Sequence, residues 1–142
     1  MARRTEAAFW SYLRGLMSPH WAVQRHEDQF TVGIPDISYS MLGVNGWIEL
    51  KSIAIANADS VIKIPHFTTS QYQWLKRHGK RGGNCYIFIE VNRKLNPEKD
   101  YLLIPHDQMD VIGEFNLKQL IDVSKYHSHN RIDITRLIKA LL

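Results

Sequence analysis

The chain has 142 residues, 44% of them hydrophobic and 23% charged, which is typical of one globular domain and excludes a disordered or fibrous protein. Its longest uninterrupted apolar run is the five residues 85–89, too short for a membrane-spanning helix. The net charge is +4, and residues 1–94 carry the excess with 12 basic and 7 acidic side chains, which favours a polyanionic partner.

The first part of the chain is predicted to contain one helix followed by three strands. Apolar residues at helical spacing predict the helix, and strand-forming runs bounded by turn residues predict the strands. The predicted ranges are a helix over 5–17 and strands over 21–27, 36–41 and 47–53. The segment 43–46 separates the last two strands, and its Asn45-Gly46 pair is a strong hairpin signal.

The second part is predicted to add a helix, two strands and a mainly helical end. The predicted ranges are a short extended piece over 61–64, a helix over 69–78 and strands over 84–91 and 101–104. Asp133 is a plausible N-cap for a terminal helix. The sequence therefore predicts an α/β domain with a mixed central sheet flanked by helices, with a core over about 5–104 and a helical C-terminal extension over about 105–142.

The polar residues with the clearest chemical meaning are Asp36, Glu49 and Lys51. The segment 33–36 reads Gly-Ile-Pro-Asp, and 49–51 reads Glu-Leu-Lys. Residues two apart on a strand face the same side, so Glu49 and Lys51 project together, and a hairpin brings Asp36 near them. The two carboxylates and the ammonium group are expected to converge.

The pairing of the two strands poses a difficulty for this arrangement. A strict two-residue turn at Asn45 and Gly46 pairs Ser40 with Lys51 and leaves Asp36 beyond the ladder. We therefore expect a wider turn that starts near Gly43, or a β-bulge.

Two carboxylates plus the backbone carbonyl of Leu50 make an oxygen-rich site for a hard divalent cation such as Mg²⁺. A metal there can polarise a phosphoryl oxygen and lower the pKa of a bound water. Lys51 can orient that water or offset negative charge in the transition state. This is the chemistry of phosphodiester hydrolysis.

These residues resemble the PD-(D/E)XK nuclease superfamily, which includes restriction endonucleases and Holliday junction resolvases. The resemblance rests on Glu6 in the first helix and on the segments 33–36 and 49–51. The segment 69–75 (Thr-Ser-Gln-Tyr-Gln-Trp-Leu) and the later Gly79 are similar to the VRR-NUC branch. The long stretch from Ala54 to His66 departs from typical members.

The resemblance implies a role for each matching residue. Asp36, Glu49 and the Leu50 carbonyl would bind Mg²⁺, or Mn²⁺ in its place, and Lys51 would be the catalytic lysine. Glu6 would support the metal site, and Gln71 would position Lys51 or the scissile phosphate. For Glu6 the alternative is a first-turn acid that complements the helix dipole, and for Gln71 it is a polar residue at a helix start.

Two groups of basic residues are expected to contact DNA: a pair near the N-terminus and a run at the end of the second predicted helix. The candidate DNA-binding residues are Arg3, Arg4, Lys76, Arg77, Lys80 and Arg81. The alternative is a solvated helix end, where cations complement the helix dipole. His127 and His129 are treated as surface histidines because no third ligand lies at a diagnostic spacing, and Cys85 as a buried structural thiol.

Together these features imply a Mg²⁺-dependent DNA endonuclease, and the family resemblance alone implies that it acts on branched DNA, as a Holliday junction resolvase does. Because cutting both arms of a branch requires two active sites, we expect a homodimer formed through apolar surface within 107–142. The alternatives are a DNA-binding module whose site is unused, or an RNA nuclease. No signal-peptide pattern opens the chain, so we expect an intracellular, cytoplasmic protein, and its small size suits a phage or another virus.

Overall fold

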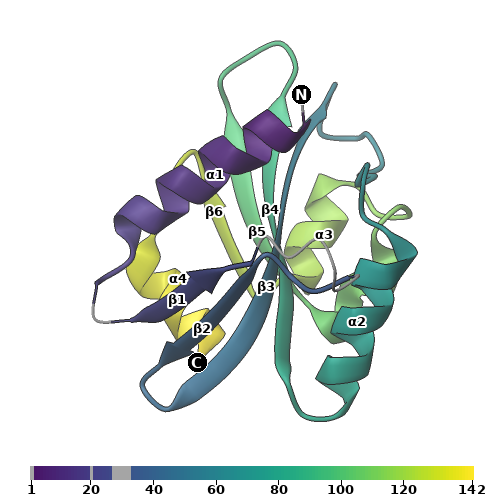
Figure 1. The fold of residues 1–142 in the computed structure, drawn as a ribbon. Coiled ribbons are helices and arrows are strands. Elements are labelled where there is room, and N and C mark those ends of the chain that lie inside the picture. Colours follow the sequence, from purple (N-terminus) through teal and green to yellow (C-terminus); the bar gives the residue numbers. More distant parts are fainter. Residues whose placement is uncertain (1, 20, 27–32) are drawn as a thin grey trace.

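The computed structural model describes residues 2–19, 21–26 and 33–142, with side chains from Glu6 onward. These residues form a six-stranded sheet with helices on both faces (Figure 1). The strands follow one another across the sheet in chain order, and neighbours run antiparallel except for one central parallel pair. The predicted α/β class, a mixed central sheet flanked by helices, is confirmed.

The elements follow the predicted order with one addition near the C-terminus. The helices are α1 (Ala2–Leu16), α2 (Thr69–Lys80), the 3₁₀ helix η1 (His106–Val111), α3 (Leu117–Val123) and α4 (Ile134–Leu141). The strands are β1 (Ala22–Arg25), β2 (Ile37–Met41), β3 (Val44–Ile55), β4 (Asn84–Arg93), β5 (Lys99–Pro105) and β6 (Tyr126–His129). No helix within the described part of the chain is long and apolar enough to cross a membrane.

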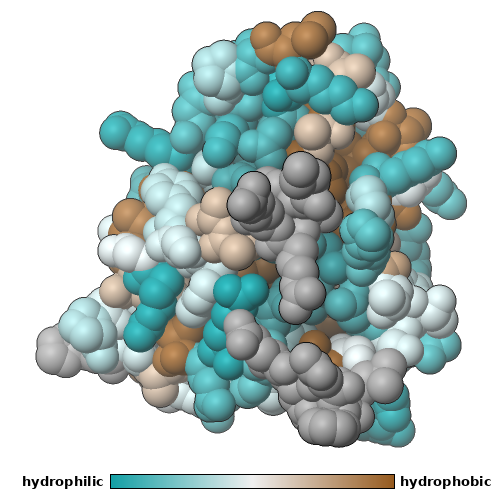
Figure 2. Space-filling model, turned by 45° about the horizontal axis from the view of Figure 1, so that its top comes forward, coloured by the Kyte–Doolittle hydropathy of each residue, from teal (hydrophilic) through white to brown (hydrophobic). Residues whose placement is uncertain are grey.

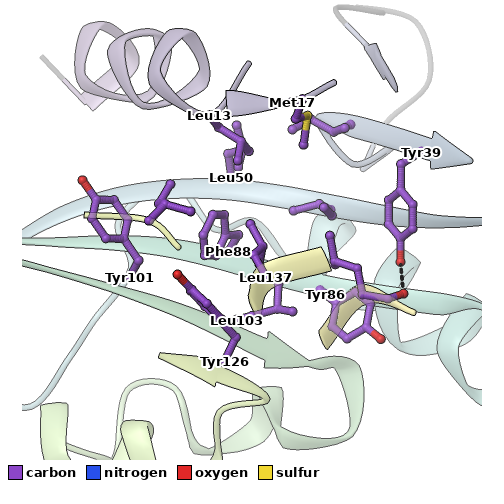
Figure 3. Packing of buried hydrophobic residues seen from close by; sticks show 14 of the residues in the cluster. Leu13, Met17, Tyr39, Leu50, Tyr86, Phe88, Tyr101, Leu103, Tyr126 and Leu137 are labelled. Atoms are coloured by element: carbon purple, nitrogen blue, oxygen red, sulfur yellow. Dashed lines mark hydrogen bonds between the residues drawn. The ribbon is translucent and has the colours of Figure 1, made fainter. Parts of the chain in front are cut away.

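The sheet separates two apolar clusters. Helices α1 and α4 cover one face, where Leu50 and Phe88 point, and Figure 3 shows this cluster from close by. Helices α2 and α3 and η1 cover the other face, where Ile87 and Ile89 point. Successive side chains of a strand face opposite sides, so β4 is apolar at nearly every position because both of its faces are buried.

The turn between β2 and β3 lies earlier than predicted. It consists of Leu42 and Gly43, whose φ angles of 51° and 82° suit a tight hairpin of type I′. The Asn45-Gly46 pair, predicted as the turn, lies inside β3. The prediction of a wider turn or a bulge is therefore wrong, because an earlier two-residue turn supplies the register.

Gly46 has a packing role inside β3. It lies opposite Tyr39 of β2, and the Tyr39 ring occupies the space that a Cβ at Gly46 would need. Tyr39 is buried, and its hydroxyl donates to the Leu141 carbonyl oxygen at 3.1 Å (Figure 3). The ring is thus fixed from two sides, which explains why glycine stands at this strand position.

Gly46→Ala is expected to lower the free energy of unfolding by ~1–3 kcal/mol, because the added methyl group displaces the Tyr39 ring. Urea unfolding followed by circular dichroism measures the change. Gly15→Ala in α1 is the matched control: a Cβ there meets nothing within 4 Å. It should stabilise the protein by at most ~1 kcal/mol. Equal stability of the Gly46→Ala variant and the wild type would contradict the assigned role.

The C-terminal region is less helical than predicted. It contributes the edge strand β6, which pairs with β5. Asp133 caps α4 as expected, accepting a hydrogen bond from the Arg136 amide at 3.2 Å. The apolar side of α4, including Leu137 and Leu141, packs into the core. This stripe is therefore used within the fold. Figure 2 shows the molecule from the top of Figure 1, where hydrophilic side chains are interspersed with hydrophobic ones.

Candidate active site

The candidate site lies beside the start of β2, where β3 continues past its partner strand. The β2–β3 ladder stops at the pair Ile37 and Ile48. Asp36 lies one residue before Ile37, and its side chain takes the place of the next backbone partner of β3. Its Oδ2 accepts a hydrogen bond from the Leu50 N–H at 2.8 Å. The carboxylate thus replaces a strand hydrogen bond, which places Asp36 beside Glu49 as the sequence predicts.

Glu49 is almost fully buried, with 1% of its surface exposed. Its Oε2 lies 3.2 Å from the Lys51 Nζ, whereas its Oε1 is buried and has no hydrogen-bond partner among the described residues. Burial and the negative charge of Asp36 raise the pKa of Glu49 well above its ordinary value, and Lys51 offsets only part of that rise. Glu49 therefore holds a proton more readily than an ordinary carboxyl group, and a cation bound beside it would favour its charged form.

Lys51 lies at the centre of the site and is 3% exposed. Besides contacting Glu49, its Nζ donates to the backbone carbonyl oxygen of His66 at 3.1 Å. The Glu6 Oε1 from α1 lies 3.9 Å away, and the Phe67 ring centroid 6.0 Å away. Because both side chains are buried, the Glu49–Lys51 pair is not an ordinary salt bridge on a solvated strand face.

Glu6 joins the site from α1, as the resemblance implies. Partial burial raises the pKa of Glu6 above its ordinary value; Lys51 opposes this rise and Asp36 adds to it. The Glu6 carboxylate thus lies near Lys51 of β3 and feels the charge of Asp36, which precedes β2. The structure thus brings together the side chains of Glu6, Asp36, Glu49 and Lys51.

The oxygen atoms of this niche suit a divalent cation. In a β-strand the N–H and C=O of one residue point to the same edge, so the Leu50 carbonyl faces the gap that Asp36 fills. Within the described ranges, no three His, Cys, Asp or Glu side chains are grouped closely enough to hold a metal by themselves. Two carboxylates, one carbonyl and retained waters match the coordination that Mg²⁺ prefers. The partnerless Oε1 of Glu49 fits this use.

Gln71 lies in the first turn of α2, where it forms a capping box with Thr68. The Gln71 Oε1 accepts from the Thr68 N–H, and the Thr68 hydroxyl accepts from the Gln71 N–H, both at 3.1 Å. The structure therefore gives Gln71 the role of a polar residue at a helix start. A contact with Lys51 or with a phosphate stays a prediction.

Gly33 brings the segment before Asp36 against α2. Its φ is +84°, and a Cβ there would lie 2.5 Å from the Ser70 carbonyl oxygen. Only glycine combines this backbone conformation with so close an approach. Gly33 thus helps to place Asp36 between the sheet and the start of α2.

The predicted DNA-binding residues divide into two groups. Arg3 and Arg4 have side chains outside the described residues. The α2 residues line an open groove of about 600 Å³ whose walls are Tyr72, Gln73, Lys76, Arg77, Lys80 and Arg81. Lys76 is paired with Asp110 at 2.6 Å, so an added phosphate competes with that pair. Arg77, Lys80 and Arg81 are exposed.

His127 and His129 lie at the far edge of the sheet, on β6. Their rings contact Asp100 of β5 at 2.7 Å and 3.1 Å, and Arg93 pairs with the same carboxylate at 2.7 Å. Burial opposes the charge of Asp100, but the hydrogen bonds from these residues outweigh it and lower the pKa of the carboxyl group. Asp100 thus organises an ion-pair network on β5 and β6, and β4 separates these strands from β3, which carries Lys51.

The Asp100 network predicts a pH dependence of stability. A carboxyl group whose pKa is lower in the folded state stabilises the fold above its ordinary pKa of 3.8, and this contribution is lost as the pH falls through the lowered pKa. Wild type is therefore expected to lose stability below about pH 4 more steeply than Asp100→Asn. Urea unfolding over a pH series measures both slopes, and equal slopes would refute the assignment.

The comparisons with known proteins do not identify the function of this site. No family model matches the chain, and no curated protein matches it. Among solved structures, a Holliday junction resolvase, Hjc from Archaeoglobus fulgidus, is similar at 10% sequence identity with a TM-score of 0.33, and the match covers 74% of each chain. At that TM-score the similarity is no evidence for the function, and the function is inferred from the site itself.

Proposed function

We propose that this protein is a Mg²⁺-dependent nuclease that hydrolyses phosphodiester bonds of DNA at the niche formed by Asp36, Glu49 and Lys51. The observation that supports this most is the buried Glu49 carboxylate, whose Oε1 lacks a partner in the described structure while Asp36 raises its pKa. Two close carboxylates beside one ammonium group are costly in a buried place unless a cation joins them.

Asp36, Glu49 and the Leu50 carbonyl would hold the metal, and Mn²⁺ is an acceptable substitute for these oxygen ligands. Bound there, Mg²⁺ would polarise a phosphoryl oxygen and lower the pKa of a nearby water. Hydrolysis adds water across a P–O ester bond and leaves a phosphate monoester and a hydroxyl group. Lys51 supplies a fixed positive charge that stabilises the negative charge developing on the phosphate.

The basic groove on α2 supports a nucleic acid as the substrate. Arg77, Lys80 and Arg81 are exposed side by side near the C-terminal end of the helix and can follow a phosphate backbone. The resemblance noted from the sequence favours branched DNA and a homodimer, because two cuts at one branch need two sites. Both the branched substrate and the dimer belong to the proposal.

A cleavage panel tests the proposal. Labelled four-way junction, flap, linear duplex, single-stranded DNA and RNA are incubated with wild type and with Asp36→Asn, in Mg²⁺ and in Mn²⁺. Asp122→Asn, an exposed change on α3, serves as the matched control for Asp36→Asn. Faster cutting of the junction than of the duplex is the expected result. Cutting of RNA alone would replace DNA with RNA as the substrate. Binding without cutting in either metal would favour a DNA-binding module.

A further inference from the structure

The connection between β3 and α2, residues 56–68, contacts two parts of the structure. It first packs beneath α2 and α3, and it then returns to the candidate site. Ile62 is fully buried in the cluster under α2 and α3. Its N–H donates to the Phe115 carbonyl, and its carbonyl accepts from the Gly113 N–H, both at 2.9 Å. The connection is therefore tied by backbone hydrogen bonds to the loop between η1 and α3.

Four residues further on, the same connection reaches Lys51. The His66 carbonyl oxygen accepts a hydrogen bond from the Lys51 Nζ at 3.1 Å. His66 adopts a left-handed backbone conformation, with φ of 63°, and its side chain is exposed on the Glu6 side of the site. Thr68 then caps α2 through its hydroxyl group, which fixes the chain on the far side of His66.

A left-handed residue other than glycine costs energy and persists where the surroundings hold it. Here the tie at Ile62 and the cap at Thr68 hold the chain on both sides of His66. The conformation directs a backbone carbonyl at a buried ammonium group. The result is a second hydrogen-bond partner for Lys51, whose long side chain needs more than one partner to keep a single position.

The kind of acceptor matters for the chemistry. An ammonium group has three protons, and Glu49 and the His66 carbonyl receive two of them. The carbonyl is neutral, so it orients the ammonium group without cancelling its charge. In the proposed reaction the Lys51 ammonium group would be directed at a phosphate, and Glu49 is not its only anchor.

Building on the proposed function, we infer that His66 is a positioning residue that acts through its backbone carbonyl. The segment 56–67, docked on residues 113–116, holds Lys51 in the orientation that the hydrolysis requires. This inference also assigns a purpose to part of the C-terminal region: the loop between η1 and α3 supports the position of the proposed catalytic lysine.

Two substitutions at position 66 separate the carbonyl from the imidazole. Asn tolerates a positive φ, so His66→Asn removes the imidazole and keeps the carbonyl in place. Val is β-branched and strongly disfavours a positive φ, so His66→Val turns the carbonyl away. Position 66 is exposed, so both variants are expected to fold, and circular dichroism checks this.

Two readouts are measured on wild type and both variants. The first is the ¹H–¹⁵N NMR signal of the Lys51 ammonium group in metal-free protein, assigned by its absence in Lys51→Met. The second is the rate of DNA cleavage, split into kcat and KM. His66→Val is expected to lose the ammonium signal and ~10–100-fold in kcat with KM unchanged, because a misplaced group mainly lowers the rate of the chemical step. His66→Asn is expected to stay within about twofold of wild type in both, because it keeps the carbonyl.

Equal losses in the two variants would overturn the inference, because the imidazole would then be the active part. An unchanged signal and rate in His66→Val would also overturn it. If wild type shows the ammonium signal, His66→Val loses it and no protein cuts DNA, the proposed function fails while the contact between His66 and Lys51 stands. The two failures are therefore distinguishable.

Discussion

Lys51→Ala is expected to reduce the rate of DNA cleavage by ~100–1,000-fold, the usual cost of removing one group that stabilises charge in a transition state. The variant should bind DNA nearly as tightly as wild type, because Lys51 is 3% exposed whereas the basic groove on α2 is open. Single-turnover cleavage with saturating protein measures the rate, and fluorescence anisotropy in Ca²⁺ measures binding.

The matched control for this change is Lys118→Ala, which removes an exposed lysine from α3. It changes the net charge by the same amount, so any general effect of charge on DNA binding appears in both variants. Cleavage by Lys118→Ala should equal that of wild type. If Lys51→Ala cuts as fast as Lys118→Ala, Lys51 does not take part in the reaction.

The second large effect is expected on metal binding. Asp36→Asn keeps an oxygen that accepts the hydrogen bond from the Leu50 N–H but removes the charge. Binding of Mn²⁺ should weaken by at least ~100-fold, because the loss of even an outer-shell partner costs up to that much. Electron paramagnetic resonance of free Mn²⁺ in a titration gives the dissociation constant without any cleavage.

Thermal stability provides a second check on the same site. A cation that binds the folded state raises the melting temperature, by an amount that corresponds to ~2.7 kcal/mol at a concentration of 100 Kd. Wild type is expected to show this rise in Mg²⁺, and Asp36→Asn is expected to show little of it at the same concentration. An equal rise in both proteins would place the bound cation elsewhere.

The sequence predicted most helices and strands because their patterns are local. Apolar residues at helical spacing predicted α1 and α2, and the uninterrupted apolar run over 85–89 predicted β4 as a strand buried on both faces. The approach of Asp36 to Glu49 was predicted from a hairpin between their strands, although the turn that sets the pairing was placed wrongly. These features depend on residues close in the chain or on a single pairing.

Features that depend on distant residues were not predictable. The turn lies at Leu42 and Gly43 instead of Asn45-Gly46, and in this register the Tyr39 ring packs over Gly46, a contact across two strands. Strand β6 depends on pairing with β5, and its short sequence carries no strong strand signal. The contact between His66 and Lys51 depends on the docking of Ile62, which no local pattern reveals.

The sequence predicted which side chains meet at the site better than it predicted their individual contacts. The acidic residues and Lys51 were identified from their spacing and from the family resemblance. Gln71 was assigned to Lys51 or the phosphate, whereas its carbonyl oxygen caps α2, because Thr68 three residues earlier completes a capping box. The Thr-x-x-Gln spacing was visible in the sequence and was the signal for this alternative.

The most direct test of the central claim is cleavage of a labelled four-way junction by wild type and Glu49→Gln in Mg²⁺, with an excess of chelator as the metal-free arm. Glu49→Gln preserves the shape of the buried side chain and removes its charge. We expect wild type to cut only without chelator, and Glu49→Gln to cut at least ~100-fold more slowly while it binds the junction equally well. Equal rates in the two proteins, or cutting that persists in chelator, would contradict a metal-dependent site at Asp36 and Glu49.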